Sequence, residues 1–64
     1  MTVEDVYSFD EDDLFYRAEE SEYWANFYMF YSKVKFIELE QLTSQQRAWL
    51  EDAQMSIDSE SNVT

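Results

Sequence analysis

The chain has 64 residues, of which 15 are acidic and four are basic, and its formal net charge is −11. It contains no Cys, which excludes a disulfide framework and a thiolate metal site, and no His, which removes the commonest general base. Gly and Pro are absent as well. Since the tight turns between strands depend on such residues, composition favours an all-α fold.

Many of the side chains available to form a hydrophobic core are aromatic. Five Phe, five Tyr and two Trp make up 19% of the chain, and each aromatic side chain can bury roughly 150–250 Å². A chain of this length buries only about 60% of the surface that its unfolded form exposes. We therefore predict one small domain over residues 1–57, stabilised by aromatic packing and by association with another chain.

Two helix starts are expected near the N-terminus. Thr2 and Asp5 have the spacing of a short first helix. Asp10 marks a second start, because its carboxylate can accept from the unpaired N–H groups of a first turn, and the acids at 11–13 favour that turn electrostatically. Phe9 and Leu14 have the spacing of a hydrophobic staple. The sequence thus predicts a helix that begins directly after Asp10.

No Gly or Pro interrupts the next thirty residues, so we predict one long helix over residues 11–41. One stripe at alternating three- and four-residue spacing consists of Tyr16, Tyr23, Phe27, Phe30, Val34 and Ile37, with Glu20 as an intruder. A second set, Trp24, Tyr28 and Tyr31, flanks it. Residues 34–39 are ambiguous, because such apolar runs suit a helix or a short strand. We expect a continued helix there.

A further helix is predicted over residues 44–57. Thr43 and Gln46 fit a capping box, and the apolar face consists of Trp49, Leu50, Ala53 and Ile57. Residues 58–64 are polar and without periodicity, which predicts a disordered tail. The expected architecture is a helical hairpin, formed by a long helix and a shorter antiparallel one, with a short N-terminal helix at one end. Two helices leave the aromatic arc half covered, so we expect a homodimer or a hetero-complex.

The acids are concentrated in the N-terminal third. Nine fall within nineteen residues: Glu4, Asp5, Asp10, Glu11, Asp12, Asp13, Glu19, Glu20 and Glu22. Helix capping accounts for those at 10–13 but not for the other five. The overall charge argues against direct contact with nucleic acid or an anionic membrane and for a basic partner, such as a nucleic-acid-binding protein. No 18-residue apolar run or leader pattern is present, and we expect a cytoplasmic location.

Catalysis and metal binding are disfavoured. Nucleophile–base pairs need His, and phosphate-binding loops need Gly. Asp10, Asp12 and Asp13 resemble the start of a calcium loop, but that pattern needs Gly at its sixth position, where Phe15 stands. We therefore expect no enzyme activity, no metal and no cofactor. Aromatic side chains can stack on bases, but four basic residues cannot form the groove that this mode requires.

A further possible function is mimicry of the phosphate groups of nucleic acid by the acidic side chains. Duplex DNA carries about one charge per 1.7 Å of axis, and a helix rises about 1.5 Å per residue, so nine acids in nineteen residues approach that density. In size, charge and aromatic content the chain resembles the phage- and plasmid-encoded DNA-mimic inhibitors, among them anti-restriction, anti-CRISPR and glycosylase-inhibiting proteins. Members of that class share no motif, so the resemblance implies a function but assigns no residue roles. It also implies action in the host cytoplasm.

Three interpretations of these patterns stay open. The leading one is an acidic inhibitor of a nucleic-acid-binding host protein, in which the nine acids supply the charge. Aromatic anchors would stabilise that complex, and the residues predicted for this role are Tyr16, Trp24, Tyr28 and Tyr31. The second is a helical adaptor or antitoxin-like assembly module that binds through its aromatic surface. The third is an ordinary helical protein with a solvated acidic face.

Overall fold

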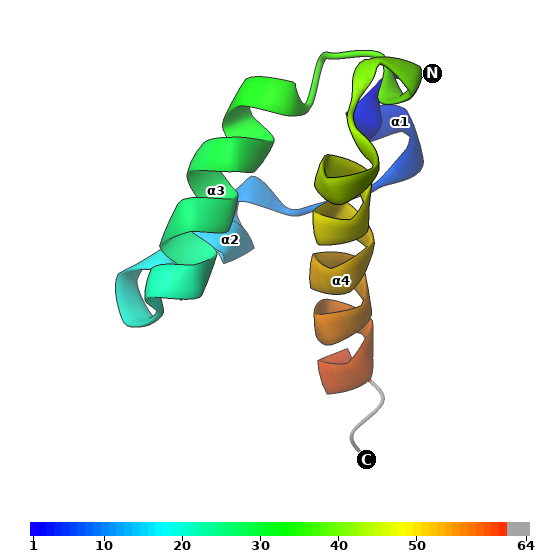
Figure 1. Cartoon of the computed structure of the whole chain (residues 1–64). Coiled ribbons are helices and arrows are strands. Elements are labelled where there is room, and N and C mark those ends of the chain that lie inside the picture. The colour runs from blue at the N-terminus through cyan, green and yellow to red at the C-terminus, as the bar shows by residue number, and fades with distance from the viewer. Residues whose placement is uncertain (62–64) are drawn as a thin grey trace.

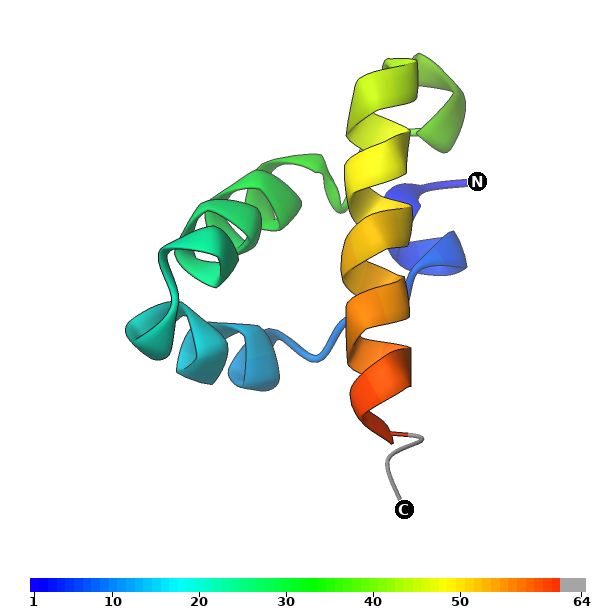
Figure 2. The ribbon, with the colours of Figure 1, turned by 60° about the horizontal axis from the view of Figure 1, so that its bottom comes forward.

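The computed structural model describes residues 1–61, and within them every regular element is a helix, so the predicted all-α class is confirmed. Its elements in chain order are α1 (Val3–Val6), α2 (Glu11–Glu20), α3 (Glu22–Val34), the 3-10 turn η1 (Leu39–Gln41) and α4 (Ser44–Ser61). α2 and α3 pack on each other as a hairpin. α4 runs in the opposite direction to α3 in Figure 1 and crosses it at a steep angle in Figure 2. α1 lies beside α4 (Figures 1 and 2), where its first residues bond to the chain that follows α3.

The predicted starts of α1 and α2 are confirmed. The Asp10 side chain accepts from the backbone N–H groups of Asp12, at 3.0 Å, and Asp13, at 3.4 Å. At α1 the Thr2 N–H donates to the Asp5 carboxylate at 3.1 Å. These short-range bonds satisfy donors that a helix leaves free at its N-terminus.

The prediction of one unbroken helix over 11–41 is wrong at Ser21, where α2 ends and α3 begins. Ser21 is extended, with φ −141° and ψ 129°. Its N–H donates to the Arg17 carbonyl, and its carbonyl accepts from the Ala25 N–H, both at 2.9 Å. Ser21 is therefore both the C-cap of α2 and the N-cap of α3. Acids favour a helix N-terminus, so Glu22 stabilises the start of α3, whereas Glu20 at the C-terminus of α2 opposes the break.

The long helix also ends earlier than predicted, and residues 35–41 are not α-helical. α3 stops at Val34, and the N-terminal segment then meets the chain that follows it. The N–H groups of Val3 and Glu4 donate to the carbonyls of Ile37 and Lys35, each at 3.0 Å. An isolated antiparallel bridge joins Thr2 to Glu38. Residues 35–39 thus form neither an α-helix nor a strand, because N–H groups 31 and 34 residues earlier in the sequence bind the carbonyls of Lys35 and Ile37.

The predicted start of α4 is confirmed in detail, but its predicted end is wrong. Thr43 N–H donates to Gln46 Oε1 at 3.0 Å, and Gln46 N–H donates to Thr43 Oγ1 at 3.1 Å, which is a reciprocal capping box. The helix then runs to Ser61, four residues beyond the expected end at Ile57. The remainder of the predicted tail, residues 62–64, lies outside the described residues.

A single cluster of buried apolar side chains holds these elements together. Its members are Val3, Phe9, Leu14, Phe27, Tyr31, Val34, Leu42, Leu50 and Ala53. Phe27 lies at its centre, with Phe9 at 5.1 Å, Trp24 at 5.7 Å and Trp49 at 5.6 Å between ring centroids. The predicted face of α4 and the Phe9–Leu14 pair are both part of this cluster or packed against it, which confirms those assignments.

The buried face of α3 confirms the predicted stripe in part, since Phe27 and Val34 belong to both. The side chains that point inward are Phe27, Tyr31 and Val34, with Trp24 packed against them. Tyr23, a predicted stripe member, is 40% exposed. The inward face is thus rotated towards the set that was expected only to flank the stripe. The cause is the break at Ser21, which lets α2 fold back and cover that side.

Candidate functional site

Four of the nine N-terminal acids have structural roles. Asp5 and Asp10 cap helices, as described above. Glu11, at the start of α2, pairs with Lys35 at the end of α3, with 2.6 Å between Oε1 and Nζ. Asp13 pairs with Arg17 at 2.7 Å within α2. These carboxylates stabilise the hairpin and its helix ends, so they contribute less to a recognition surface than the sequence suggested.

Arg17 connects three helices. Its Nε donates to Asp13 and its Nη1 donates to Glu60 of α4, both at 2.7 Å. Its guanidinium also lies over the Trp24 ring of α3, 5.1 Å from the ring centroid, a distance at which a cation is attracted to the aromatic face. The Arg17 side chain is 21% exposed. It therefore holds the C-terminal part of α4 against the hairpin.

Three of the other acids lie on one side of α2. Asp12, Glu19 and Glu20 are exposed, and no ion pair involves them within residues 1–61. Tyr16 stands four residues after Asp12 and three and four before the two Glu residues, a spacing that places all of them on neighbouring turns of the helix. Tyr16 is 69% exposed. We call these four residues the α2 acidic face; it is turned away from buried Leu14.

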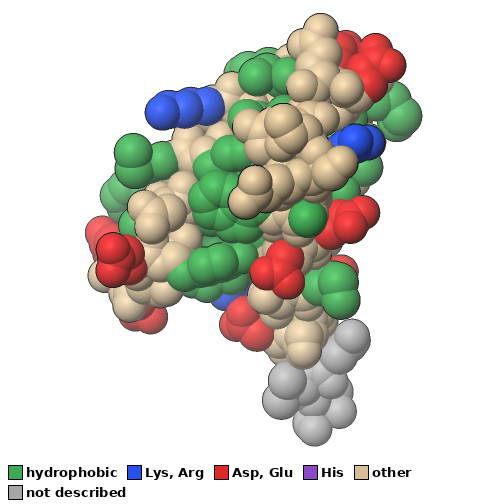
Figure 3. Space-filling view, viewed as in Figure 1, with side chains coloured by type: hydrophobic (Ala, Val, Ile, Leu, Met, Phe, Trp, Pro, Cys, Tyr) green, Lys and Arg blue, Asp and Glu red, His purple; other side chains and the backbone are tan. Residues whose placement is uncertain are grey.

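Further exposed acids lie outside the region that the sequence singled out. Glu22 begins α3 beside the α2 acidic face, and Glu4 lies on α1. The acids Glu40, Glu51, Asp52 and Asp58 are exposed on η1 and α4. In Figure 3 acidic side chains surround a band of apolar side chains that follows the seam between α3 and α4. The charge is therefore spread around the molecule, with its densest exposed group on α2.

The four predicted aromatic anchors lie in different environments. Tyr16 is exposed on the α2 acidic face. Trp24 and Tyr28 are half-buried and pack against the core. Tyr31 is 3% exposed, so it belongs to the core, and its prediction as a surface anchor is wrong. The sequence misassigned it because the direction in which α3 faces its neighbours depends on the break at Ser21.

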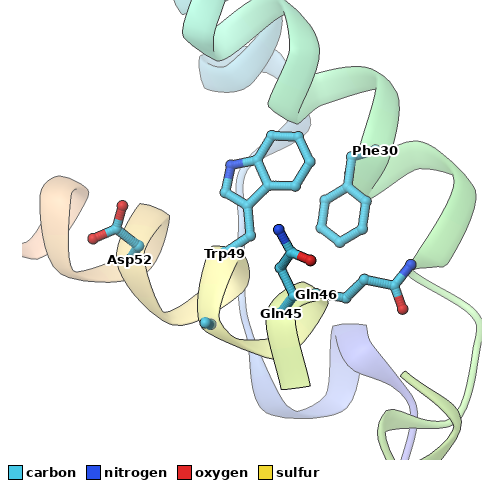
Figure 4. A pocket seen from close by; sticks show the side chains of 6 residues that line it. Phe30, Gln45, Gln46, Trp49 and Asp52 are labelled. Carbon is cyan, nitrogen blue, oxygen red and sulfur yellow. The ribbon is translucent and has the colours of Figure 1, made fainter. Parts of the chain in front are cut away.

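The structure has a second surface that the sequence did not single out, at the seam between α3 and α4. Phe30 and Trp49 stack across it, with 4.5 Å between ring centroids and 14° between ring planes. Two adjoining hollows of about 550 and 470 Å³ share these rings. Figure 4 shows the larger of the two. Together they form the seam groove, which is lined by Tyr23, Asn26, Met29, Phe30 and Lys33 from α3 and by Gln45, Gln46, Ala48, Trp49 and Asp52 from α4.

Burial, hydrogen bonding and nearby charge shift the pKa values of several ionisable side chains. Burial raises the pKa of Tyr23 above its ordinary value, and the carboxylate of Asp52, across the seam, adds to that rise. The hydrogen bond to Glu11 raises the pKa of Lys35. Burial likewise raises the pKa of Tyr31. Each of these shifts favours the protonated form of the group concerned.

The described residues contain no group of three or more Asp and Glu side chains positioned to hold a metal ion. Asp10, Asp12 and Asp13, which resembled a calcium loop, are drawn into the first turn of α2, where Asp10 accepts from the other two backbones. None of the helices in residues 1–61 is long and apolar enough to cross a membrane.

Comparison with known proteins adds no family to this description. No protein-family model matches the chain, and no curated protein or solved structure shows significant similarity to it.

Proposed function

We propose that the chain is an acidic protein-binding inhibitor that occupies the nucleic-acid site of a basic partner, with the α2 acidic face as its main contact. The observation that carries this proposal is the group of exposed carboxylates on α2 that no described base neutralises, with an exposed tyrosine among them. By its resemblance to DNA-mimic inhibitors, such a protein would be encoded by a phage or mobile element and would act in the host cytoplasm.

The charge spacing on α2 supports this proposal. Asp12, Glu19 and Glu20 fall within nine residues, or about 13 Å of helix, which is roughly one charge per 4 Å. A single strand of duplex DNA presents about one charge per 3.4 Å of axis. Lys and Arg residues arranged along one phosphate strand would therefore find carboxylates at a similar density, with charge-assisted hydrogen bonds available to each.

Tyr16 supports the proposal in a different way. Contacts between exposed charges weaken as salt screens them, whereas burial of an aromatic ring does not depend on ionic strength. Tyrosine is enriched among the residues that dominate interface energies. Its position between Asp12 and Glu19 gives one face both kinds of contact, so a partner would be retained at salt concentrations that release bound DNA.

The test is capture of partners from bacterial lysate on the immobilised protein, with parallel elution by duplex DNA and by a salt gradient. The variant Asp12→Asn/Glu19→Gln/Glu20→Gln removes three charges from the α2 acidic face. It leaves Asp13 in place, because that residue pairs with Arg17. We expect a dominant partner that DNA displaces and that the variant captures at least ten-fold less well, with its helical content unchanged.

The matched control neutralises three exposed acids elsewhere, in Glu40→Gln/Glu51→Gln/Asp58→Asn. This control has the same net charge as the test variant, and we expect it to capture nearly as much partner as the unaltered protein. Equal losses in the two variants would show that total charge, and not the α2 acidic face, determines binding. A partner that resists duplex DNA and binds the test variant fully would contradict the inhibitor proposal.

The seam groove favours a second candidate function, the adaptor or assembly module. Adaptor binding through the groove would depend on exposed apolar side chains such as Met29, which is 60% exposed. The substitutions Tyr23→Ala and Met29→Ala would then release the partner, and neutralisation of α2 would not. These two positions are better probes than Trp24 and Tyr28, which pack against the core and whose loss would damage the fold.

A further inference from the structure

The seam groove has the dimensions of a site for one more helix. On α3 its lining residues Tyr23, Asn26, Phe30 and Lys33 repeat at three- and four-residue spacing. On α4 its lining residues Gln45, Ala48, Trp49 and Asp52 do the same. Each set is therefore one side of a helix, about 15 Å long on α3 and 10 Å on α4. Two helices whose adjoining sides meet at a shared pair of rings can accommodate a third helix of two to three turns.

The floor of the groove is apolar and adaptable. The stacked rings of Phe30 and Trp49 form its centre, and Met29 stands beside them. Met is unbranched and polarisable, so it fits irregular apolar surfaces. In Figure 4 the amides of Gln45 and Gln46 lie around the Phe30 ring, while Asp52 lies at the other end, beyond Trp49. An occupant thus meets apolar contacts in the middle and neutral hydrogen-bonding groups at one end.

Charge determines which helix fits. The α4 edge of the groove carries Asp52, which is the one acidic residue that lines either hollow within the described chain. The α3 edge carries Lys33. A basic residue is therefore favoured on the flank of the occupant that faces α4 and disfavoured on the flank that faces α3. A second copy of the chain would bring a further charge of −11 against the first, which long-range repulsion opposes.

We infer that the seam groove binds an amphipathic helix of a partner protein, with an apolar stripe of two to three turns and Lys or Arg along the flank that meets α4. This inference deepens the adaptor candidate and does not depend on the α2 acidic face. It assigns a role to the Phe30–Trp49 pair beyond packing, since these rings are the surface on which the apolar stripe of the partner helix lies.

The experiment uses Trp49 fluorescence as the readout. Trp24→Phe leaves Trp49 as the single tryptophan, since the chain has two. It keeps an aromatic ring at the position where Trp24 packs against the core, and circular dichroism checks that the variant is folded. The probes are two synthetic helical peptides with the same leucine stripe, one with Lys along a single flank and the other with Glu there. We expect the Lys peptide to shift the Trp49 emission to shorter wavelength at micromolar concentration and the Glu peptide to bind at least ten-fold more weakly. Equal affinity for both peptides would overturn the assigned charge.

A matched pair of substitutions distinguishes binding in the seam groove from nonspecific attraction of a basic peptide to an acidic protein. Ala48→Arg places a long side chain in the groove at an exposed position, and Ser32→Arg adds the same charge at an exposed position of α3 outside both hollows. We expect Ala48→Arg to weaken the Lys peptide at least ten-fold and Ser32→Arg to leave it within about two-fold. Equal effects would overturn the inference, as binding would then follow net charge alone.

Sedimentation of the unaltered chain tests whether a second copy of the chain, and not a basic partner helix, occupies the seam groove. We expect a constant mass over a hundred-fold range of concentration, because the groove is assigned to a basic partner helix. A mass that rises with concentration, and that Ala48→Arg returns to that of the monomer, would overturn the inference in favour of a second copy. This outcome would leave the inhibitor proposal untouched, since that proposal is tested by changes on α2.

Discussion

Trp49 of α4 lies flat against Phe30 of α3, with 4.5 Å between ring centroids and only 14° between ring planes. The same indole meets Phe27 nearly edge-on, with 5.6 Å between centroids and an interplanar angle of 68°. Trp49 thus uses one ring to contact both a core residue and a groove residue. Offset-stacked and edge-to-face pairs each add about 0.5–1.5 kcal/mol beyond the burial of their area. Stability and surface shape at the seam therefore depend on the same side chain.

Removal of this ring should destabilise the fold. Trp49 is half-buried, so we expect Trp49→Ala to lower the free energy of unfolding by about 2–3 kcal/mol, less than the 3–5 typical of a fully buried aromatic. Urea denaturation followed by circular dichroism measures the change. Phe36→Ala is the control, because Phe36 is 69% exposed, and it should cost less than about 1 kcal/mol. Similar losses in both variants would contradict the assigned role of the Phe30–Trp49 stack.

The cap of α2 makes a separate prediction. Asp10→Ala removes the acceptor for the N–H groups of Asp12 and Asp13 and should cost about 1 kcal/mol of folding stability. Asp10→Asn keeps an acceptor at the same place and should cost only a small part of that. The two variants have the same charge, so a comparison of their urea midpoints isolates the hydrogen bonds. Equal midpoints would mean that the lost charge, and not the cap, sets the effect.

Arg17 should control the C-terminal part of α4. Arg17→Met breaks the pair with Glu60 and the contact with Trp24, so hydrogen exchange should become faster for backbone amides in the last two turns of that helix. Arg17→Lys keeps the charge but not the planar group that reaches two carboxylates at once, and it should give an intermediate rate. If exchange accelerated equally along all of α4, Arg17 would act on global stability and not on this segment.

Stability should fall at alkaline pH. Burial raises the pKa of Tyr31 in the folded chain, while the unfolded chain ionises near 10. Above that pH the unfolded state releases a proton that the folded state retains, so unfolding becomes more favourable as pH rises. The stabilisation is complete below pH 10 and is lost as pH rises through the folded pKa. Lys35, whose pKa its hydrogen bond to Glu11 raises, contributes in the same direction.

Tyr31→Phe tests this dependence. The variant cannot ionise at that position, so its urea midpoint should decline less between pH 9 and pH 11 than that of the unaltered protein. A comparison of both proteins at pH 7 gives the part of the change that does not depend on pH. The slope should be reduced and not abolished, because Lys35 remains. Parallel pH profiles for the two proteins would exclude Tyr31 as a source of the alkaline loss.

Features that depend on neighbours in the sequence were predicted correctly. The cap at Asp10 and the reciprocal pair of Thr43 with Gln46 involve residues within three positions of each other. Their chemistry does not require knowledge of the rest of the fold, because a free N–H of a first turn can be satisfied by a side chain that the same turn presents. The helical class followed from composition for a similar reason.

Features that depend on distant partners were not predictable in this way. Glu11 is separated from Lys35 by 24 residues, so its use in an ion pair becomes visible only once α2 and α3 form a hairpin. The hairpin itself depends on Ser21, and serine is a weaker helix terminator than the Gly or Pro for which one would search. The assignment of Tyr31 to the surface failed for the same reason, since the break changes which side of α3 is covered.

The bonds from Val3 and Glu4 to the chain after α3 have a consequence for the order of folding. The α2–α3 hairpin is local in sequence and can form early. The two N-terminal hydrogen bonds close a loop of more than thirty residues, so they carry the larger entropic cost. We expect them to form last and to break first. Once they are broken, the carbonyls of Lys35 and Ile37 are free, and α3 can extend by a turn into the longer helix that its local sequence favours.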